Sequence, residues 1–100
     1  MVIIRIRISS KPDQGETLAR TVEEASVKVR KQPGCVTYAL FRSTEHSEQF
    51  LLYEEWQDRA SFEAYKTSNA FRNLGEALTP LLEGKPESGY YEADNFFGSE

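Results

Sequence analysis

Cysteine and histidine are nearly missing from this chain, which has one of each in 100 residues, Cys35 and His46. A single cysteine cannot form a disulfide within the chain, and it excludes any metal site built from several cysteines. A lone histidine in a polar stretch does not make a metal site either. The sequence also shows no Cys–His pair and no Ser–His–Asp pattern, so it predicts neither a nucleophilic hydrolase nor a bound metal.

An excess of positive charge is also missing. The chain has 12 lysines and arginines against 16 acidic residues, which gives a formal net charge of −4 and a pI near 5.1. Proteins that bind nucleic acid carry a basic face, whereas the basic residues here are scattered along the sequence. We therefore expect no nucleic-acid partner.

Long hydrophobic runs are absent as well. No apolar run is long enough to span a bilayer, and Arg5 interrupts the first one, unlike the core of a secretory signal peptide. These features predict no membrane association and a cytoplasmic location. The length predicts a single domain over residues 1–100, in which 94–100 form an irregular tail.

Apolar periodicity predicts four strands and two helical segments. Val2 to Ser9 alternates with its aliphatic residues on one face, and Cys35 to Ser43, Phe50 to Trp56 and Pro86 to Ala93 are the other expected strands. Asp13 and Glu16 resemble a capping box that opens a helix ending at Pro33-Gly34. A second helical segment begins at Asp58, breaks at Ser68-Asn69 and ends near Pro80.

The resulting order, βαββαβ, predicts an α+β, ferredoxin-like fold with an antiparallel sheet and helices on one face. The strands at 35–43 and 50–56 carry large side chains on both faces. Because helices on one side cover only one face, a partner subunit is the simplest cover for the other. We therefore expect a homodimer.

Aromatic residues gather between Pro33 and Phe71, and a single strand carboxylate accompanies them. Glu54 shares a strand face with Leu52 and Trp56 by period-2 alternation. If that face meets the helices, burial would raise the pKa of Glu54 and make it a plausible general base near neutrality. Trp56 would then wall a pocket, with its indole N–H aimed at a substrate oxygen.

The same residues carry a resemblance to a known family. The run from Val36 to Ser43, the signature Tyr53-Glu54-Glu55-Trp56 and the broken helix that follows are similar to antibiotic-biosynthesis monooxygenases of the quinol monooxygenase type. The resemblance covers Val2 to about Ala93. It implies a dimeric α+β barrel with a pocket in each subunit, and oxygenation of quinols, phenols or anthrones by O2 without flavin, haem or metal.

Other branches of that family degrade haem or process the signal autoinducer-2, and their site residues differ from those here. Positions at which characterised branches carry a histidine, asparagine or tyrosine hold other residues in this chain: Leu52, Phe62, Tyr65, Ala70 and Gly75. Trp56 alone remains from the anthrone-oxidising set. Without an axial ligand at position 75, haem chemistry is not expected.

We expect a cofactor-independent monooxygenase acting on a small electron-rich aromatic. Glu54 and Tyr65 are the candidate catalytic residues. The candidate substrate-binding residues are Tyr38, Leu52, Trp56, Phe62 and Phe71. Two alternatives stay open: a non-catalytic dimeric module that binds a small molecule, and an isomerase or degradative enzyme of the autoinducer-2 type.

Overall fold

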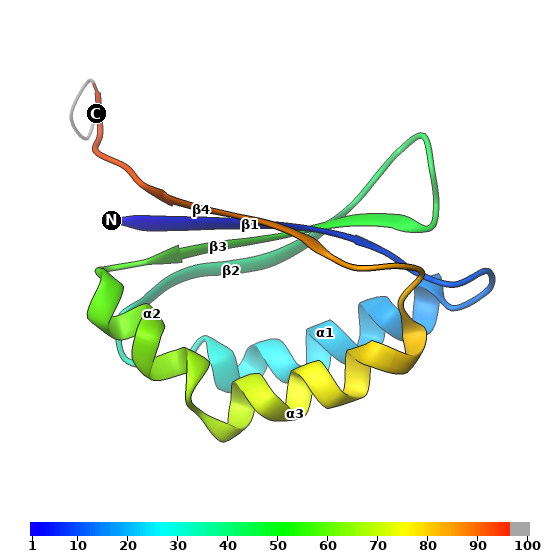
Figure 1. Ribbon diagram of the computed structural model, residues 1–100, viewed down its shortest axis with the longest axis horizontal. Helices are drawn as coiled ribbons and strands as arrows, with labels where there is room; N and C mark the ends of the chain where they lie inside the picture. Colours follow the sequence, from blue (N-terminus) through cyan, green and yellow to red (C-terminus); the bar gives the residue numbers. More distant parts are fainter. Residues whose placement is uncertain (97–100) are drawn as a thin grey trace.

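All the helices lie on one side of an antiparallel sheet (Figure 1). The computed structural model describes residues 1–96, so the predicted tail lies outside the described residues from position 97 on. Along the chain the elements are β1 (Val2–Ser9), α1 (Gly15–Val29), β2 (Cys35–Arg42), β3 (Gln49–Trp56), α2 (Arg59–Lys66), α3 (Asn69–Leu78), a 3-10 turn (Thr79–Leu81) and β4 (Glu87–Glu92). The predicted α+β, ferredoxin-like fold is confirmed.

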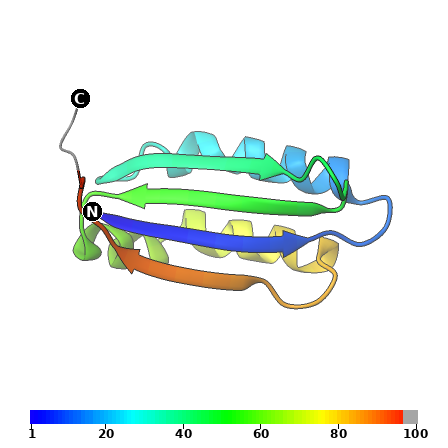
Figure 2. The same cartoon turned by 90° about the horizontal axis from the view of Figure 1, so that it is seen from above.

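The strands lie in the order β2-β3-β1-β4, with β1 and β3 at the centre (Figure 2). Every neighbouring pair is antiparallel. In the register, Glu54 of β3 lies opposite Ile4 of β1 on one side and Tyr38 of β2 on the other. Ile4 in turn lies opposite Tyr90 of β4. One row across the sheet therefore carries a carboxyl group between an aliphatic side chain and a phenol.

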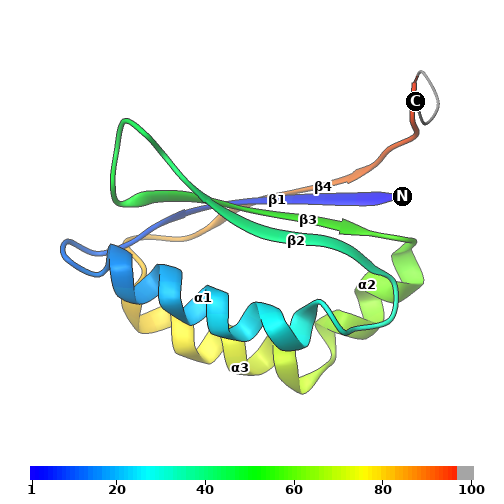
Figure 3. The same cartoon turned by 180° about the vertical axis from the view of Figure 1, so that it is seen from behind.

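The helix layer is formed mainly by α1 and α3, which lie side by side beneath the sheet (Figure 3). Leu18, Val22 and Val29 recur at helical spacing along α1, and all three are buried against the sheet. Gly34 ends the turn after α1 with φ 83°, a left-handed backbone conformation that residues other than glycine rarely adopt. A methyl group there would also collide with the Ser61 side chain.

The expected capping box at the start of α1 is wrong. Asp13 has φ 66° and lies in the preceding turn, and Gln14 is the N-cap residue, without a side-chain capping bond. Glu16 instead accepts a hydrogen bond from Arg42 at 2.6 Å. The guanidinium of a neighbouring strand is a stronger partner for this carboxylate than a backbone N–H at the helix start.

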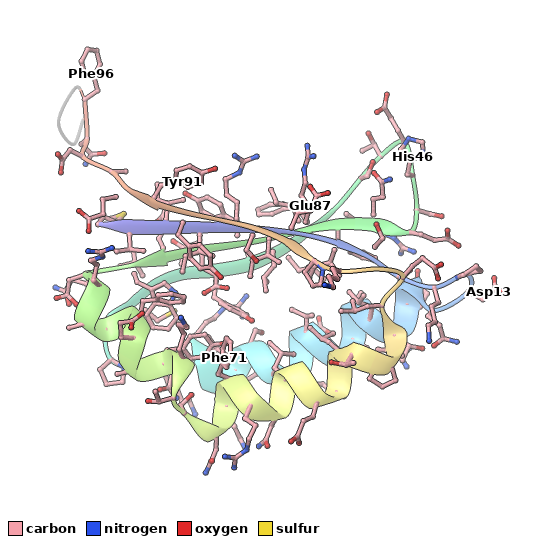
Figure 4. All side chains as sticks on the ribbon, in the orientation of Figure 1. Asp13, His46, Phe71, Glu87, Tyr91 and Phe96 are labelled. Carbon is pink, nitrogen blue, oxygen red and sulfur yellow. The ribbon has the colours of Figure 1, made fainter. Side chains whose placement is uncertain are left out.

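The outer face of the sheet, away from the helices, carries large apolar side chains. Phe41 is 56% exposed and Tyr91 50% exposed, and Tyr91 stands on the side opposite the helices in Figure 4. Ile3, Leu51 and Tyr53 share this face and are partly buried. The second apolar face that the sequence predicted is therefore present. Within residues 1–96, no helix is both long enough and apolar enough to cross a membrane.

Candidate functional site

A largely apolar cavity of about 440 Å³ lies between the sheet and the helices. Ile4, Ile6 and Ile8 of β1 line its sheet side, and Leu74 and Leu78 of α3 line its helix side. Tyr90 of β4 and Lys66 of α2 also border it. Two other hollows have a similar volume, one between α1 and β2 and one on the outer face of the sheet, but charged and polar side chains dominate their walls. A cavity with apolar walls and a few polar groups is the usual form of a small-molecule site.

Glu54 is the acidic group in the wall of this cavity. Strand alternation places Leu52, Glu54 and Trp56 on the face toward the helices, and the Glu54 side chain is only 3% exposed. Burial raises the pKa of Glu54 to about 7, although the hydrogen bond from Trp56 acts in the opposite direction. The carboxyl group therefore changes its ionisation near neutral pH, because its strand face meets the helices, which is the condition that the sequence left open.

Trp56 does not line the cavity but holds Glu54 in place through a hydrogen bond. Its side chain is fully buried, and its indole N–H donates to Oε1 of Glu54 at 2.8 Å. We expected this N–H to point at a substrate oxygen, and that prediction is wrong because the carboxylate two residues earlier on the same face is its acceptor. The indole also stacks on Tyr65, with ring centroids 4.8 Å apart. Trp56 thus fixes the positions of both candidate catalytic side chains.

Two tyrosines, both buried, line the cavity beside Glu54. The part of the cavity lined by these three side chains is called its inner end. Tyr65 comes from α2 and Tyr38 from β2, and their rings meet edge to face with centroids 6.5 Å apart. Burial raises the pKa of Tyr65 to about 12 and that of Tyr38 well above its usual range. Both phenols therefore keep their protons at neutral pH and can donate hydrogen bonds.

The break between α2 and α3 brings two more aromatic side chains to the cavity. The Ser68 side chain accepts from the N–H of Phe71 at 3.2 Å and so begins α3. Phe71 meets Tyr65 edge-on at 5.3 Å, and it points from α3 toward the sheet in Figure 4. Phe62 packs between Trp56 and Tyr90, at 6.1 and 5.9 Å. Phe71 is 41% exposed, so it stands where the cavity meets solvent.

All but one of the predicted site residues line the cavity: Tyr38, Leu52, Glu54, Phe62, Tyr65 and Phe71. Trp56 is the exception. Sequence reasoning missed other residues that line it, chiefly Ile4, Ile6, Ile8, Lys66, Leu74, Leu78 and Tyr90. The alternation of β1 and the spacing of α3 were visible in the sequence, but they predict a core equally well.

The structure offers no residues for a metal ion in the part of the chain that it describes. No group of three or more His, Cys, Asp or Glu side chains converges there. His46 lies at the tip of the loop between β2 and β3, on the side of the sheet away from the cavity (Figure 4). The absence of a cofactor from the reaction stays a prediction.

Comparison with known proteins identifies the family of the chain. Residues 1–77 match the model of the family described as antibiotic biosynthesis monooxygenase. The chain belongs to this family. The matched segment runs from β1 almost to the end of α3, so it includes the predicted site residues and excludes β4.

Two solved structures have the same fold as this chain. A crystal structure described as an antibiotic biosynthesis monooxygenase superposes with a TM-score of 0.85 at 22% identity, over 95% of this chain and 100% of that one. Rv0793 from Mycobacterium tuberculosis gives 0.85 at 19% identity, over 94% and 95% of the two chains. At such identities the likeness shows the fold alone.

A curated relative from Synechocystis sp., the uncharacterized protein sll1783, is 28% identical over 94 residues. The match covers 91% of this chain but only 62% of the relative's length. That protein's name states no substrate. The family rests on the match over residues 1–77, and the substrate has to be argued from the site.

Proposed function

We propose that this chain is a cofactor-independent monooxygenase that oxidises a small electron-rich aromatic of quinol, phenol or anthrone type with O2. The observation that carries the proposal is Glu54, a buried carboxyl group with a pKa near 7 in the wall of an apolar cavity. Such a group accepts a proton readily at neutral pH and is near the optimum for a general base. The aromatic walls suit a flat ring.

The first step is removal of the substrate's hydroxyl proton. The proton passes to the carboxylate of Glu54, and the electron pair stays on the substrate oxygen as a phenolate. Trp56 already occupies Oε1 of Glu54, which leaves Oε2 to take the proton. The buried rings of Phe62 and Tyr65 keep water from the surroundings of Glu54, which strengthens electrostatic interactions there.

The second step uses O2 as the oxidant. The phenolate passes one electron to O2, and the phenoxyl radical and superoxide recombine to form a carbon–oxygen bond at an ortho or para ring carbon. Glu54 returns its proton to the distal oxygen of the peroxide. The ring proton then leaves, the O–O bond breaks, and one oxygen stays as a quinone carbonyl while the other departs as water.

Oxygen uptake tests the proposal. A panel of hydroquinones, phenols and anthrones in chelator-treated, flavin-free buffer should show a protein-dependent rate for at least one compound. Glu54→Gln keeps the shape but cannot accept the proton, so we expect kcat to fall roughly 100-fold or more. Glu55→Gln is the matched control, because Glu55 lies on the outer face. Rates no higher than autoxidation for the whole panel would contradict the proposal, and ligand binding without turnover would favour a binding module.

For the partner, we propose that a second copy of the chain covers the outer face of the sheet. Phe41 and Tyr91 are exposed there, and large exposed apolar patches rimmed by polar groups mark interaction sites. Arg7 and Glu87 lie on the same face, with side chains 4.0 Å apart and largely exposed. A face that carries both charge signs can pair with its own copy across a two-fold axis.

A further inference from the structure

The hydroxyl group of Tyr38 is a buried polar group without a partner. Tyr38 is 2% exposed, and its Oη forms no hydrogen bond with any group in residues 1–96. Most buried hydroxyl groups in proteins are hydrogen-bonded, because leaving one unpaired in an apolar setting is unfavourable. The Tyr65 hydroxyl is close enough to contribute to the pKa of Tyr38, and Tyr38 to that of Tyr65, but its position does not meet the geometry of a hydrogen bond to the Tyr38 hydroxyl.

This hydroxyl stands next to the general base of the proposed reaction. Tyr38 and Glu54 are direct cross-strand partners, and both side chains face the helices and line the cavity. The negative charge of Glu54 contributes to raising the pKa of Tyr38. Glu54 accepts hydrogen bonds when ionised, whereas Tyr38 can donate one.

We propose that Tyr38 selects ligands that bring an oxygen atom to the inner end of the cavity, where that oxygen accepts a hydrogen bond from Tyr38 while its own proton faces Glu54. The inference rests on the proposed function and narrows its substrate class to aromatics with a free hydroxyl group that enters first. When Glu54 takes the proton, the electron pair remains on the substrate oxygen, and the Tyr38 hydroxyl stabilises the negative charge. No further reactant is needed for this step.

A pair of ligands of equal size separates this role from simple packing. The affinities of 2-naphthol and 2-methylnaphthalene are measured by isothermal titration calorimetry in oxygen-free buffer at pH 8, with the ligand in the cell because both compounds are sparingly soluble. We expect the wild-type protein to prefer 2-naphthol. Tyr38→Phe removes only the hydroxyl group, so it should lower the affinity for 2-naphthol roughly 3- to 10-fold, the range expected for one neutral hydrogen bond. The affinity for 2-methylnaphthalene should not fall.

Tyr53→Phe is the matched control, because the Tyr53 hydroxyl donates a hydrogen bond to Glu55 on the outer face of the sheet. It should keep the wild-type preference. The inference would be overturned if Tyr38→Phe lowered the affinity for both ligands equally, or if the wild-type protein showed no preference for 2-naphthol.

The two proposals can fail separately. A Tyr38-dependent preference without any oxygen uptake would overturn the monooxygenase and leave the role of Tyr38 standing. Oxygen uptake by the wild type together with an unchanged preference in Tyr38→Phe would overturn the role of Tyr38 alone. If neither ligand binds, the role of Tyr38 is overturned.

Discussion

Glu54 is the residue at which stability and function oppose one another. Its carboxyl group is 3% exposed, and its pKa is raised from 4.5 to about 7, mainly because burial disfavours the charged form. The folded state therefore binds a proton more tightly than the unfolded chain does. Between those two pKa values the folded protein loses stability as the pH rises, and above about 7 the full penalty of a buried charge is present.

Glu54→Gln should remove this pH dependence. The shift from 4.5 to about 7 corresponds to at most about 3 kcal/mol, so the variant should gain up to that amount in free energy of unfolding at pH 8, relative to wild type, and little at pH 4. Urea unfolding at both pH values measures the difference. Glu55→Gln should keep the wild-type fall in stability between pH 4 and pH 8. The same fall in Glu54→Gln would contradict the raised pKa of Glu54.

At the scale of elements, the break between α2 and α3 shapes the cavity. A continuous helix would carry Tyr65 and Phe71 along one straight axis, whereas the break lets the two rings meet at 90°. Ser68 holds the break from both sides, since its hydroxyl donates to the carbonyl of Tyr65 at 2.6 Å and accepts from the N–H of Phe71. Local polar bonds thus decide the position of two cavity walls.

Ser68→Ala should lower the free energy of unfolding by about 1 kcal/mol, the usual value for a lost N-cap, and should also weaken 2-naphthol binding. Asp58→Ala is the matched control, because Asp58 caps α2 through the N–H of Ser61 at 2.8 Å, and Asp58 does not line the cavity. Asp58→Ala should lower the free energy of unfolding by a similar amount and leave the affinity for 2-naphthol unchanged. Chemical denaturation and calorimetry measure the two effects. Equal losses of affinity in both variants would show that the break has no special role.

At the scale of the whole molecule, the sheet has two apolar faces and helices for only one of them. The inner face is covered and encloses the cavity, and the outer face leaves Phe41 and Tyr91 exposed. A chain of this size buries only about two thirds of its unfolded surface. A second copy on the outer face would therefore add substantially to its stability.

Phe41→Asp should convert a dimer to a monomer, because a buried charge at the interface would lack a partner. Light scattering coupled to gel filtration at about 20 µM measures the mass. Val27→Asp is the control: Val27 is also 56% exposed, but it lies on α1 in the helix layer, so the mass should remain that of the wild type. A monomeric wild type at this concentration would contradict the proposed dimer.

Much of the fold could be predicted from local patterns in the sequence. The alternation of Val2 to Ser9, the Pro33-Gly34 stop and the break at Ser68 each follow from short-range physics, namely side-chain period, backbone conformation and capping. The start of α1 could not be predicted in this way. Glu16 has a long-range partner, Arg42, whose position depends on the fold.

The sequence by itself determined the order of the elements, the apolar faces of the strands and the strand face that Glu54 shares with Leu52 and Trp56. The structure decided that this face lies toward the helices. Only the tertiary structure decided which atoms meet. The indole N–H of Trp56 donates to Glu54, the hydroxyl of Tyr38 has no hydrogen-bond partner in residues 1–96, and the isoleucines of β1 line the cavity, although their alternation predicted a core equally well. Side-chain period sets the face of a residue, whereas contacts and empty space depend on strand register and helix position, which local sequence does not fix.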